Sequence, residues 1–392
     1  MPSDGESTRR RYAGLDGLRG VGALGVILLH VWIFTYADAG KPAKTATDNI
    51  ISELRLALPM FFVLSGFLLI QPWLRQSRTG QGPDVWTYLR HRAGRILPGY
   101  WAALIGSLIV LWGTGNRMMP PVDHIPLFLV FAQNQDPDSL FLLDPPMWSL
   151  GVEVAFYLLL PLFGWLLRRR GMSATRQIVA CLVIVAVGAA FNTWAEITDA
   201  ERIVTASLMS QLPYFGFGMA AAVIWHKRTA PGWLAIPGCA LVAADAAWHI
   251  QVNAPVEHWV KDVPAGIGFA LIIASAPRLL DLAPVRLLGK ASYGLYLWHF
   301  PVIVWLRING HWPDGGLVAA YALVTAITGV LATASWLLIE KPAIAWAHRR
   351  REPRPAARPT PRSGSEQPPG IGDGVVARPD LVGVLRFGER SE

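Results

Sequence analysis

The sequence predicts an all-α integral membrane protein with about ten transmembrane helices. The 392-residue chain is 53% hydrophobic and only 16% charged, whereas soluble domains carry about 25% charged residues. Its apolar stretches also reach the roughly 20 residues that a helix needs to cross the hydrocarbon core of a bilayer. The expected spans are residues 15–36, 54–74, 95–113, 147–167, 177–194, 203–226, 232–250, 263–280, 289–308 and 316–340.

The remaining segments complete this layout. The apolar segment 125–133 is too short to cross and is expected to be re-entrant or interfacial. The polar residues 1–14 show no cleavable signal pattern and predict a cytoplasmic segment before a membrane domain over 15–342. Residues 343–392 are rich in Pro, Arg, Gly and Ser and predict a disordered cytoplasmic tail, because this composition buries too little apolar area to fold.

The distribution of Lys and Arg predicts the orientation. With the N-terminus in the cytoplasm, ten spans place most of the Lys and Arg residues on that side, about threefold more than outside, as the positive-inside rule requires. An even number of spans puts both termini in the cytoplasm, and we expect the inner membrane of a bacterial cell. Nucleic acid is not an expected partner despite the net charge of +8, because no soluble basic domain remains to bind it. Cys181 and Cys239 lie in apolar stretches and indicate packing residues, so no metal or bound cofactor is expected.

Ionisable residues inside spans are costly and are therefore candidates for function. The candidates are Asp16, Arg19, His30, Glu153, Asp245, His249, His299 and Glu340. Arg19 and His30 are eleven residues apart, which is about 16 Å along a helix and close to one face. An Arg near the cytoplasmic end and a deeper His suit a long anionic donor. Equally, Arg19 could snorkel to the interface and His30 could hydrogen-bond a neighbouring helix.

Other spans carry further polar candidates. Arg90, Arg92 and Arg95 in YLRHRAGRILPGYW could bind phosphate bidentately or anchor lipid headgroups. Glu153 needs a partner, which Arg19 or His30 could provide.

Two spans predict polar helix faces. Tyr293, Tyr296 and His299 share one face at three-residue spacing and predict a cavity lining. Asp245 and His249, at i and i+4, could line an acceptor entrance. The glycines of the first span predict close approach of another helix or of a ligand; they are Gly17, Gly20, Gly22 and Gly25.

These motifs, taken in order over residues 12–342, resemble the acyltransferase-3 family of membrane O-acyltransferases. LDGLRGVGALGVILLH resembles its first-span signature, MFFVLSGFLL its second-span motif and LRHRAGRILPGYW its Arg-rich loop, although His91 stands where a second basic residue is more usual. WSLGVEVAFYLLLP, SYGLYLWHFP and IEKP resemble its later motifs.

The resemblance implies transfer of a short acyl group, such as acetyl, from cytosolic acyl-CoA as co-substrate to a hydroxyl of a carbohydrate, glycolipid or glycosylated natural product. His30 would be the catalytic base, and Arg19 and Glu153 would assist it. Arg19, Arg90, Arg92 and Arg95 would bind acyl-CoA. Ser65, Trp148, Tyr293, Tyr296 and His299 would line the site. Some family members carry a fused hydrolase-like domain; none is visible here, so we expect this chain to transfer the group itself or pass it to a separate protein.

The sequence leaves three alternatives open: a different acceptor and two different functions. The acceptor could be a secreted antibiotic such as a macrolide or its sugar. The protein could instead transport a lipid-linked sugar, although no duplicated halves are found. A scaffolding role would leave the ordered polar residues without a purpose.

Overall fold

The computed structural model describes residues 13–36, 45–76, 83–167, 172–226, 230–252, 262–276, 280 and 282–349. These segments are helical and contain no strand, so the predicted all-α class is confirmed. The expected N-terminal segment, up to residue 12, and the expected tail, from residue 350, lie outside the described residues. The α-helices are α2 (Ala13–Thr35), α3 (Ala46–Ser52), α4 (Ala57–Gln76), α5 (Val85–Leu111), α6 (Ile125–Leu129), α7 (Trp148–Leu167), α8 (Ala174–Ile197), α9 (Arg202–Thr205), α10 (Leu208–Ile224), α11 (Ala235–Gln251), α12 (Val263–Ser275), α13 (Ala283–Ile308), α14 (Gly316–Ser335) and α15 (Lys341–His348).

Each of the ten predicted spans corresponds to a helix, but the helices differ in length and polarity. Eight helical segments of the described chain are long and apolar enough to cross a membrane. The other two predicted spans correspond to α12, which has only 13 residues, and to α13, which has 26 residues but carries Arg286, Lys290 and Arg307. Segment 125–133 contains only the five-residue helix α6 and does not span. Helical structure continues past the predicted domain boundary at residue 342, because α15 extends to His348.

Local sequence signals explain where several helices begin. The Asp84 carboxylate accepts a hydrogen bond from the Thr87 backbone N–H at the start of α5, and the Ser173 hydroxyl accepts one from the Arg176 N–H at the start of α8. Such caps satisfy N–H groups that have no partner within the helix. Pro301 lies inside α13, which is tolerated in membrane helices because neighbouring groups satisfy the freed backbone positions.

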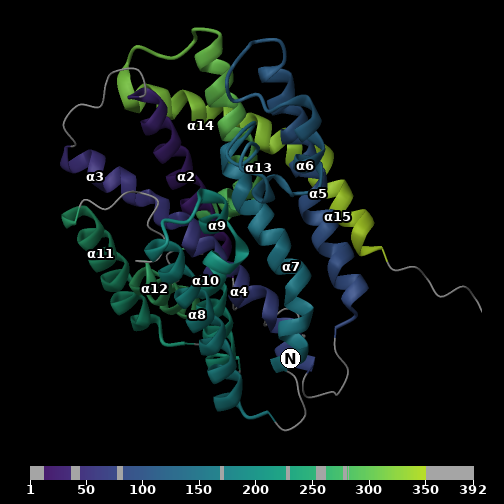
Figure 1. The fold of residues 1–392 in the computed structure, drawn as a ribbon, viewed down its shortest axis with the longest axis vertical. Coiled ribbons are helices and arrows are strands. Elements are labelled where there is room, and N and C mark those ends of the chain that lie inside the picture. Colours follow the sequence, from purple (N-terminus) through teal and green to yellow (C-terminus); the bar gives the residue numbers. More distant parts are fainter. Residues whose placement is uncertain are drawn as a thin grey trace, which may run out of the picture. The chain divides into compact units, whose positions relative to one another are not determined.

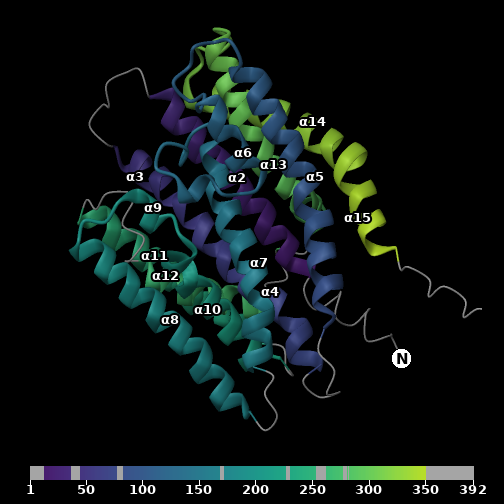
Figure 2. The ribbon, with the colours of Figure 1, turned by 45° about the vertical axis from the view of Figure 1, so that its right-hand side comes forward.

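The helices form two groups that meet at α4 and α7. Helices α8, α10, α11 and α12 lie together on one side, and α5, α13, α14 and α15 lie on the other (Figures 1 and 2). α2 packs along α13 and α14, and α4 packs along α10 and α12. Because α2, α4, α5, α7, α13 and α15 all approach the boundary between the two groups, polar residues from distant parts of the chain meet there.

Glycines allow α2 and α13 to approach closely. A Cβ at Gly289 would lie 2.0 Å from the Asp16 carbonyl oxygen, and one at Gly20 would lie 2.7 Å from the Leu288 Cβ. A Cβ at Gly17 would likewise clash with the backbone of Leu280. Small residues at such crossings permit backbone contact between membrane helices. The predicted role of these first-span glycines is therefore confirmed at the α13 contact.

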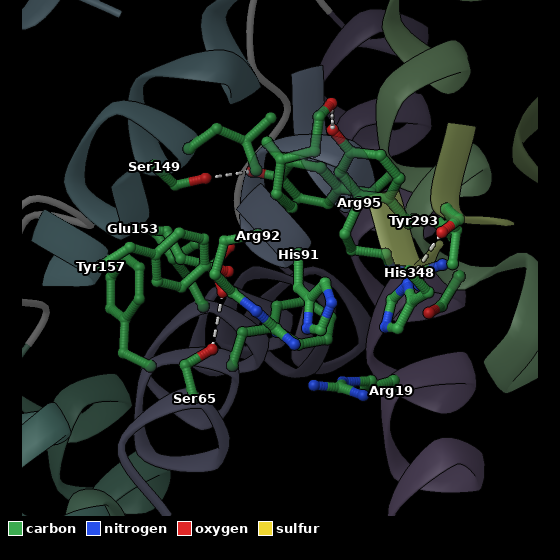
Figure 3. Close-up of a pocket in the computed structure, with 18 residues that line it drawn as sticks. Arg19, Ser65, His91, Arg92, Arg95, Ser149, Glu153, Tyr157, Tyr293 and His348 are labelled. Carbon is green, nitrogen blue, oxygen red and sulfur yellow. Dashed lines mark hydrogen bonds between the residues drawn. The ribbon is translucent and has the colours of Figure 1, made fainter. Parts of the chain in front are cut away.

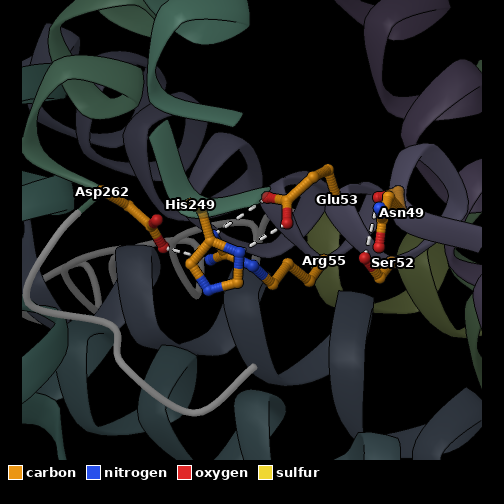
Figure 4. A network of polar contacts seen from close by, with 6 residues as sticks. All are labelled: Asn49, Ser52, Glu53, Arg55, His249 and Asp262. Carbon is orange, nitrogen blue, oxygen red and sulfur yellow. Dashed lines mark hydrogen bonds and ion pairs between the residues drawn. The ribbon is translucent and has the colours of Figure 1, made fainter. Parts of the chain in front are cut away.

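A buried network of charged residues joins the start of α4 to α11 and α12 (Figure 4). Arg55, in the 3-10 turn Glu53–Leu56, donates to the Asp262 carboxylate at 2.6 Å and lies 3.0 Å from Glu53. The other Glu53 oxygen lies 2.6 Å from His249 Nδ1. These four side chains are each at most 8% exposed. Because the positive guanidinium lies between two carboxylates, the network holds this end of α4 against the α11–α12 pair.

Candidate active site

A cavity of about 310 Å³ lies where six helices converge (Figure 3). Its walls combine polar groups with apolar side chains, which is typical of small-molecule sites. α2, α4, α5, α7, α13 and α15 supply the lining, which comprises Arg19, Leu58, Phe61, Phe62, Ser65, His91, Arg92, Arg95, Ile96, Ser149, Leu150, Glu153, Tyr157, Ser292, Tyr293, Tyr296, Ile344 and His348. The N-terminal parts of α2, α5 and α13 and the C-terminal end of α15 meet there, and the predicted topology places all four on the cytoplasmic side.

Three guanidinium groups make one part of the cavity wall cationic. Arg19 lies 3.6 Å from Asp16, one turn away on α2. Arg95 lies over the rings of Tyr293 and Trp336, at 5.6 Å and 5.4 Å from their centroids. Among the described residues, the buried Nε of Arg92 has no hydrogen-bond partner. The cavity thus offers planar, permanently charged groups of the kind that bind phosphate.

Glu153 is the acidic group of the cavity and is held by α4. The Ser65 hydroxyl donates to Glu153 Oε1 at 2.7 Å, and both side chains line the cavity on the side opposite Arg95 (Figure 3). The Cβ of a residue larger than glycine at Gly66 would lie 2.2 Å from the Phe215 carbonyl oxygen. Gly66 therefore lets α4 lie against α10, and this packing fixes the direction in which Ser65 points.

The tyrosines of α13 are anchored through their hydroxyl groups. Tyr293 donates to the Ile96 carbonyl at 2.7 Å, and Tyr296 donates to the Pro146 carbonyl at 2.8 Å. The Ser149 hydroxyl lies 2.7 Å from the Tyr296 hydroxyl. Both tyrosines line the cavity, as their helical spacing predicted.

His30 and His299 lie next to the cavity rather than in its wall. Tyr296 lines the cavity, its ring centroid is 5.9 Å from that of His299, and the His299 ring centroid is 5.0 Å from that of His30. The two imidazoles are 3.2 Å apart between His299 Nε2 and His30 Nδ1. The structure therefore brings the predicted base close to the cavity, with the Tyr296–His299 pair between them.

Two further residues predicted for the site do not reach the cavity. Arg90 lies two residues before Arg92, so the helical rotation of about 100° per residue points it away from the face that carries Arg92 and Arg95. Trp148 is buried at 7% exposure and packs edge-on against Phe141 at 6.1 Å. Trp148, predicted to line the site, is therefore outside the cavity lining, and the acyl-CoA contact predicted for Arg90 stays a prediction.

The remaining ionisable candidates also lie outside the cavity lining. Asp245 and His249 are buried at 5% exposure each, and His249 belongs to the network of Figure 4, so they do not line an entrance to this cavity. Glu340 is 1% exposed and accepts from the Ser335 hydroxyl at 3.2 Å. It ends a π-helical turn, Trp336–Glu340, that joins α14 to α15.

The structure adds lining residues that the sequence did not single out. Ser149 and Tyr157 lie one turn on either side of Glu153 on α7, so the helical spacing could have indicated them. His348 stacks on His91 with ring centroids 3.9 Å apart and an interplanar angle of 8°. Since His348 lies beyond the predicted domain boundary, no signal within the spans could have found it.

Comparison with known proteins decides the family. The family model described as "Acyltransferase domain" matches residues 12–340. The chain belongs to the acyltransferase-3 family. The predicted resemblance is thus confirmed over nearly the whole described region.

Within this acyltransferase family, curated relatives are identical to the chain at about a quarter of the aligned positions. "O-acetyltransferase OatA" of Staphylococcus aureus is 24% identical over 367 residues, which is 85% of this chain and 57% of the relative. "Putative peptidoglycan O-acetyltransferase YrhL" of Bacillus subtilis is 24% identical over 370 residues, or 85% of this chain and 55% of the relative. "Nodulation protein 10" of Rhizobium leguminosarum is 26% identical over 379 residues, covering 88% of this chain and 96% of the relative. The chain thus spans little more than half the length of the first two relatives. No solved structure matches it.

Proposed function

We propose that this protein is a membrane O-acyltransferase that moves a short acyl group from acyl-CoA to a hydroxyl of a carbohydrate, glycolipid or glycosylated natural product. The observation that carries the proposal is the cavity in which Arg19, Arg92 and Arg95 adjoin Tyr296 and, behind it, His299 and His30. The family match and the names of OatA and YrhL, both O-acetyltransferases, support the same reaction class.

In this proposal the donor enters from the cytoplasmic side, and its phosphates bind the cationic wall. Among the described residues, neither Arg92 nor Arg95 has a carboxylate within 4.0 Å, so both guanidinium groups can bind an anionic ligand. Arg19 and His30 are about 16 Å apart along α2. A donor with charged phosphates at one end and a thioester at the end of a long arm can therefore reach from the cationic wall toward the histidines.

The chemical step uses His30 as a general base. His30 removes the proton from the acceptor hydroxyl as its oxygen attacks the thioester carbonyl, and the carbon–sulfur bond then breaks. The proton passes from His30 to the departing thiolate, so acyl ester and free CoA are the products. Arg19 assists by holding the donor at the far end of its arm, because it lies about 16 Å from His30 along α2. Glu153, held by Ser65, balances part of the positive charge of the guanidinium groups.

The test is transfer of label from radiolabelled acetyl-CoA in membranes that contain wild-type protein, His30→Ala or His311→Ala. His311 is exposed on the loop after α13 and provides the matched control. Loss of a general base lowers transfer about 10²- to 10⁴-fold, while the control should keep wild-type activity. Chromatography of the labelled product then distinguishes envelope polysaccharide, glycolipid and a secreted antibiotic as acceptor.

Two outcomes contradict the proposal. Undiminished transfer by His30→Ala would show that His30 is not the general base. The absence of label in every fraction, with propionyl-CoA and isovaleryl-CoA as well, would contradict acyl transfer from CoA and favour the alternative of lipid-linked sugar transport.

A further inference from the structure

The contact between His30 and His299 is defined on both sides by backbone carbonyl groups. His30 Nδ1 lies 2.9 Å from the Val26 carbonyl oxygen, and His299 Nδ1 lies 2.7 Å from the Tyr296 carbonyl oxygen. A carbonyl oxygen only accepts hydrogen bonds. Both Nδ1 atoms therefore carry a proton when the rings are neutral.

These two protons determine the direction of the bond between the rings. In neutral His299 the proton is on Nδ1, so Nε2 has a free electron pair and accepts. His30 Nδ1–H, at 3.2 Å, is the donor to it, shared with the Val26 carbonyl. The Nε2 of His30 is then the unprotonated nitrogen of its ring, and no described residue hydrogen-bonds to it.

We propose that His299 is a positioning residue that accepts a hydrogen bond from His30 Nδ1–H, fixes the orientation of the His30 ring and stabilises the imidazolium formed when Nε2 takes the acceptor's proton. This inference rests on the proposed function, in which His30 is the base. A third group that orients the base and stabilises its protonated form is a general requirement of such catalysis. In this protein the neutral imidazole of His299 is that third group.

The surroundings of His299 suit this role. The side chain is 0% exposed, its Nδ1 is held by the preceding turn of its own helix, and the His30–Phe300 edge contact at 5.9 Å restricts the His30 ring from another side. When His30 gains a proton on Nε2, the Nδ1–H bond becomes charge-assisted and shortens. The proton stays on His30 until the thiolate takes it, so His299 remains neutral throughout.

Two substitutions at His299 separate the hydrogen bond to His30 from simple packing. His299→Asn keeps a donor near the Tyr296 carbonyl but removes the acceptor at the Nε2 position. His299→Gln is long enough to place an amide oxygen near the former Nε2 and so to accept from His30. We expect His299→Asn to lower kcat about 10- to 100-fold, with an unchanged KM for acetyl-CoA, and His299→Gln to recover most of the loss. His311→Asn is the matched control and should behave as the wild type.

A spectroscopic measurement tests the bond without activity. Magic-angle-spinning NMR of ¹⁵N-histidine-labelled protein in liposomes reports which nitrogen of each ring is protonated, and His30→Gln assigns the His30 signals. The wild type should show His30 protonated on Nδ1, His299 unprotonated on Nε2, and a correlation between these two nitrogens. A protonated His299 Nε2 would overturn the inference even if neither His299 variant folds.

The outcomes separate this inference from the proposed function. If His30→Ala abolishes transfer but His299→Asn retains wild-type kcat, His299 has only a packing role and the proposed function stands. If His30→Ala retains transfer, His30 is not the base and this inference fails with it, whatever the NMR spectrum shows, while acyl transfer itself stands.

Discussion

Replacing Gly289 by alanine tests whether close packing of α2 on α13 aligns the two histidines. The new Cβ would lie 2.0 Å from the Asp16 carbonyl oxygen, whereas a carbon–oxygen contact in proteins requires about 3.3 Å. The backbones must therefore separate by about 1.3 Å at this point. No flexible side chain can absorb this shift, because the atoms in contact belong to the backbone of α2.

The separation has a calculable effect on the site. If α13 moves as a rigid body away from α2, the 3.2 Å contact between His30 Nδ1 and His299 Nε2 lengthens to about 4.5 Å, beyond hydrogen-bonding distance. Overpacking of this kind also costs about 1–3 kcal/mol of stability. We therefore expect Gly289→Ala to lose at least about tenfold in acyl transfer and to lower the midpoint of thermal unfolding.

The measurements are the initial rate of acetyl transfer and the thermal midpoint followed by size-exclusion chromatography of detergent-extracted protein. Gly329→Ala on α14 is the matched control, because its added Cβ meets no atom within 4 Å. Alanine is the better helix former by about 1 kcal/mol, so this control should be active and at least as stable as the wild type. Wild-type transfer and an unchanged midpoint in Gly289→Ala would refute the packing argument.

The remaining predictions concern stability. Arg55→Leu leaves two buried carboxylates without their cation and should cost about 3–5 kcal/mol, measured as a lower thermal midpoint; an unchanged midpoint would contradict the buried network. The Ser139 hydroxyl, with His124 nearby, lowers the pKa of Asp136 in the loop between α5 and α7. The ionised Asp136 carboxylate therefore stabilises the folded state fully above the ordinary Asp pKa of about 3.9. This stabilisation is lost as the pH falls through the lowered pKa of Asp136 in the folded protein. Thermal midpoints between pH 6 and pH 3 should fall less steeply for Asp136→Asn than for the wild type or for the exposed control Asp138→Asn, and equal slopes would contradict the assignment.

The sequence predicted the helices well because length and hydrophobicity are local properties. Each predicted apolar stretch is helical, and the short segment containing α6 does not cross. The lengths were less predictable from hydropathy: the span was predicted to reach residue 280, but α12 ends at Ser275 with Ala276 in a left-handed conformation, directly before Pro277 in the sequence. A window of hydropathy does not register this end, whereas the proline does.

The site was predictable where residues share one helix face and not where tertiary contacts decide. Tyr293 and Tyr296 reach the cavity because three-residue spacing aligns them. Arg90 does not reach it, since residues two apart on a helix point to opposite sides. The approach of His299 to His30 could not be predicted from either span alone, because the glycine contacts between α2 and α13 bring the rings together.

The two polar centres of the described chain differ in how their charges are balanced, and this difference separates structure from function. In the buried network, Arg55 lies within 3.0 Å of both Glu53 and Asp262, so two carboxylates balance its charge at contact distance. Around the cavity, Arg19 lies 3.6 Å from Asp16, and Glu340 acts on Arg95 from beyond contact distance. Among the described residues, no carboxylate lies within 4.0 Å of the Arg92 or Arg95 guanidinium, and the buried Nε of Arg92 has no hydrogen-bond partner. Burying cations without matching anions costs free energy. Guanidinium groups without a carboxylate in contact can bind an anionic ligand, which is the property that the proposed acyl-CoA site requires.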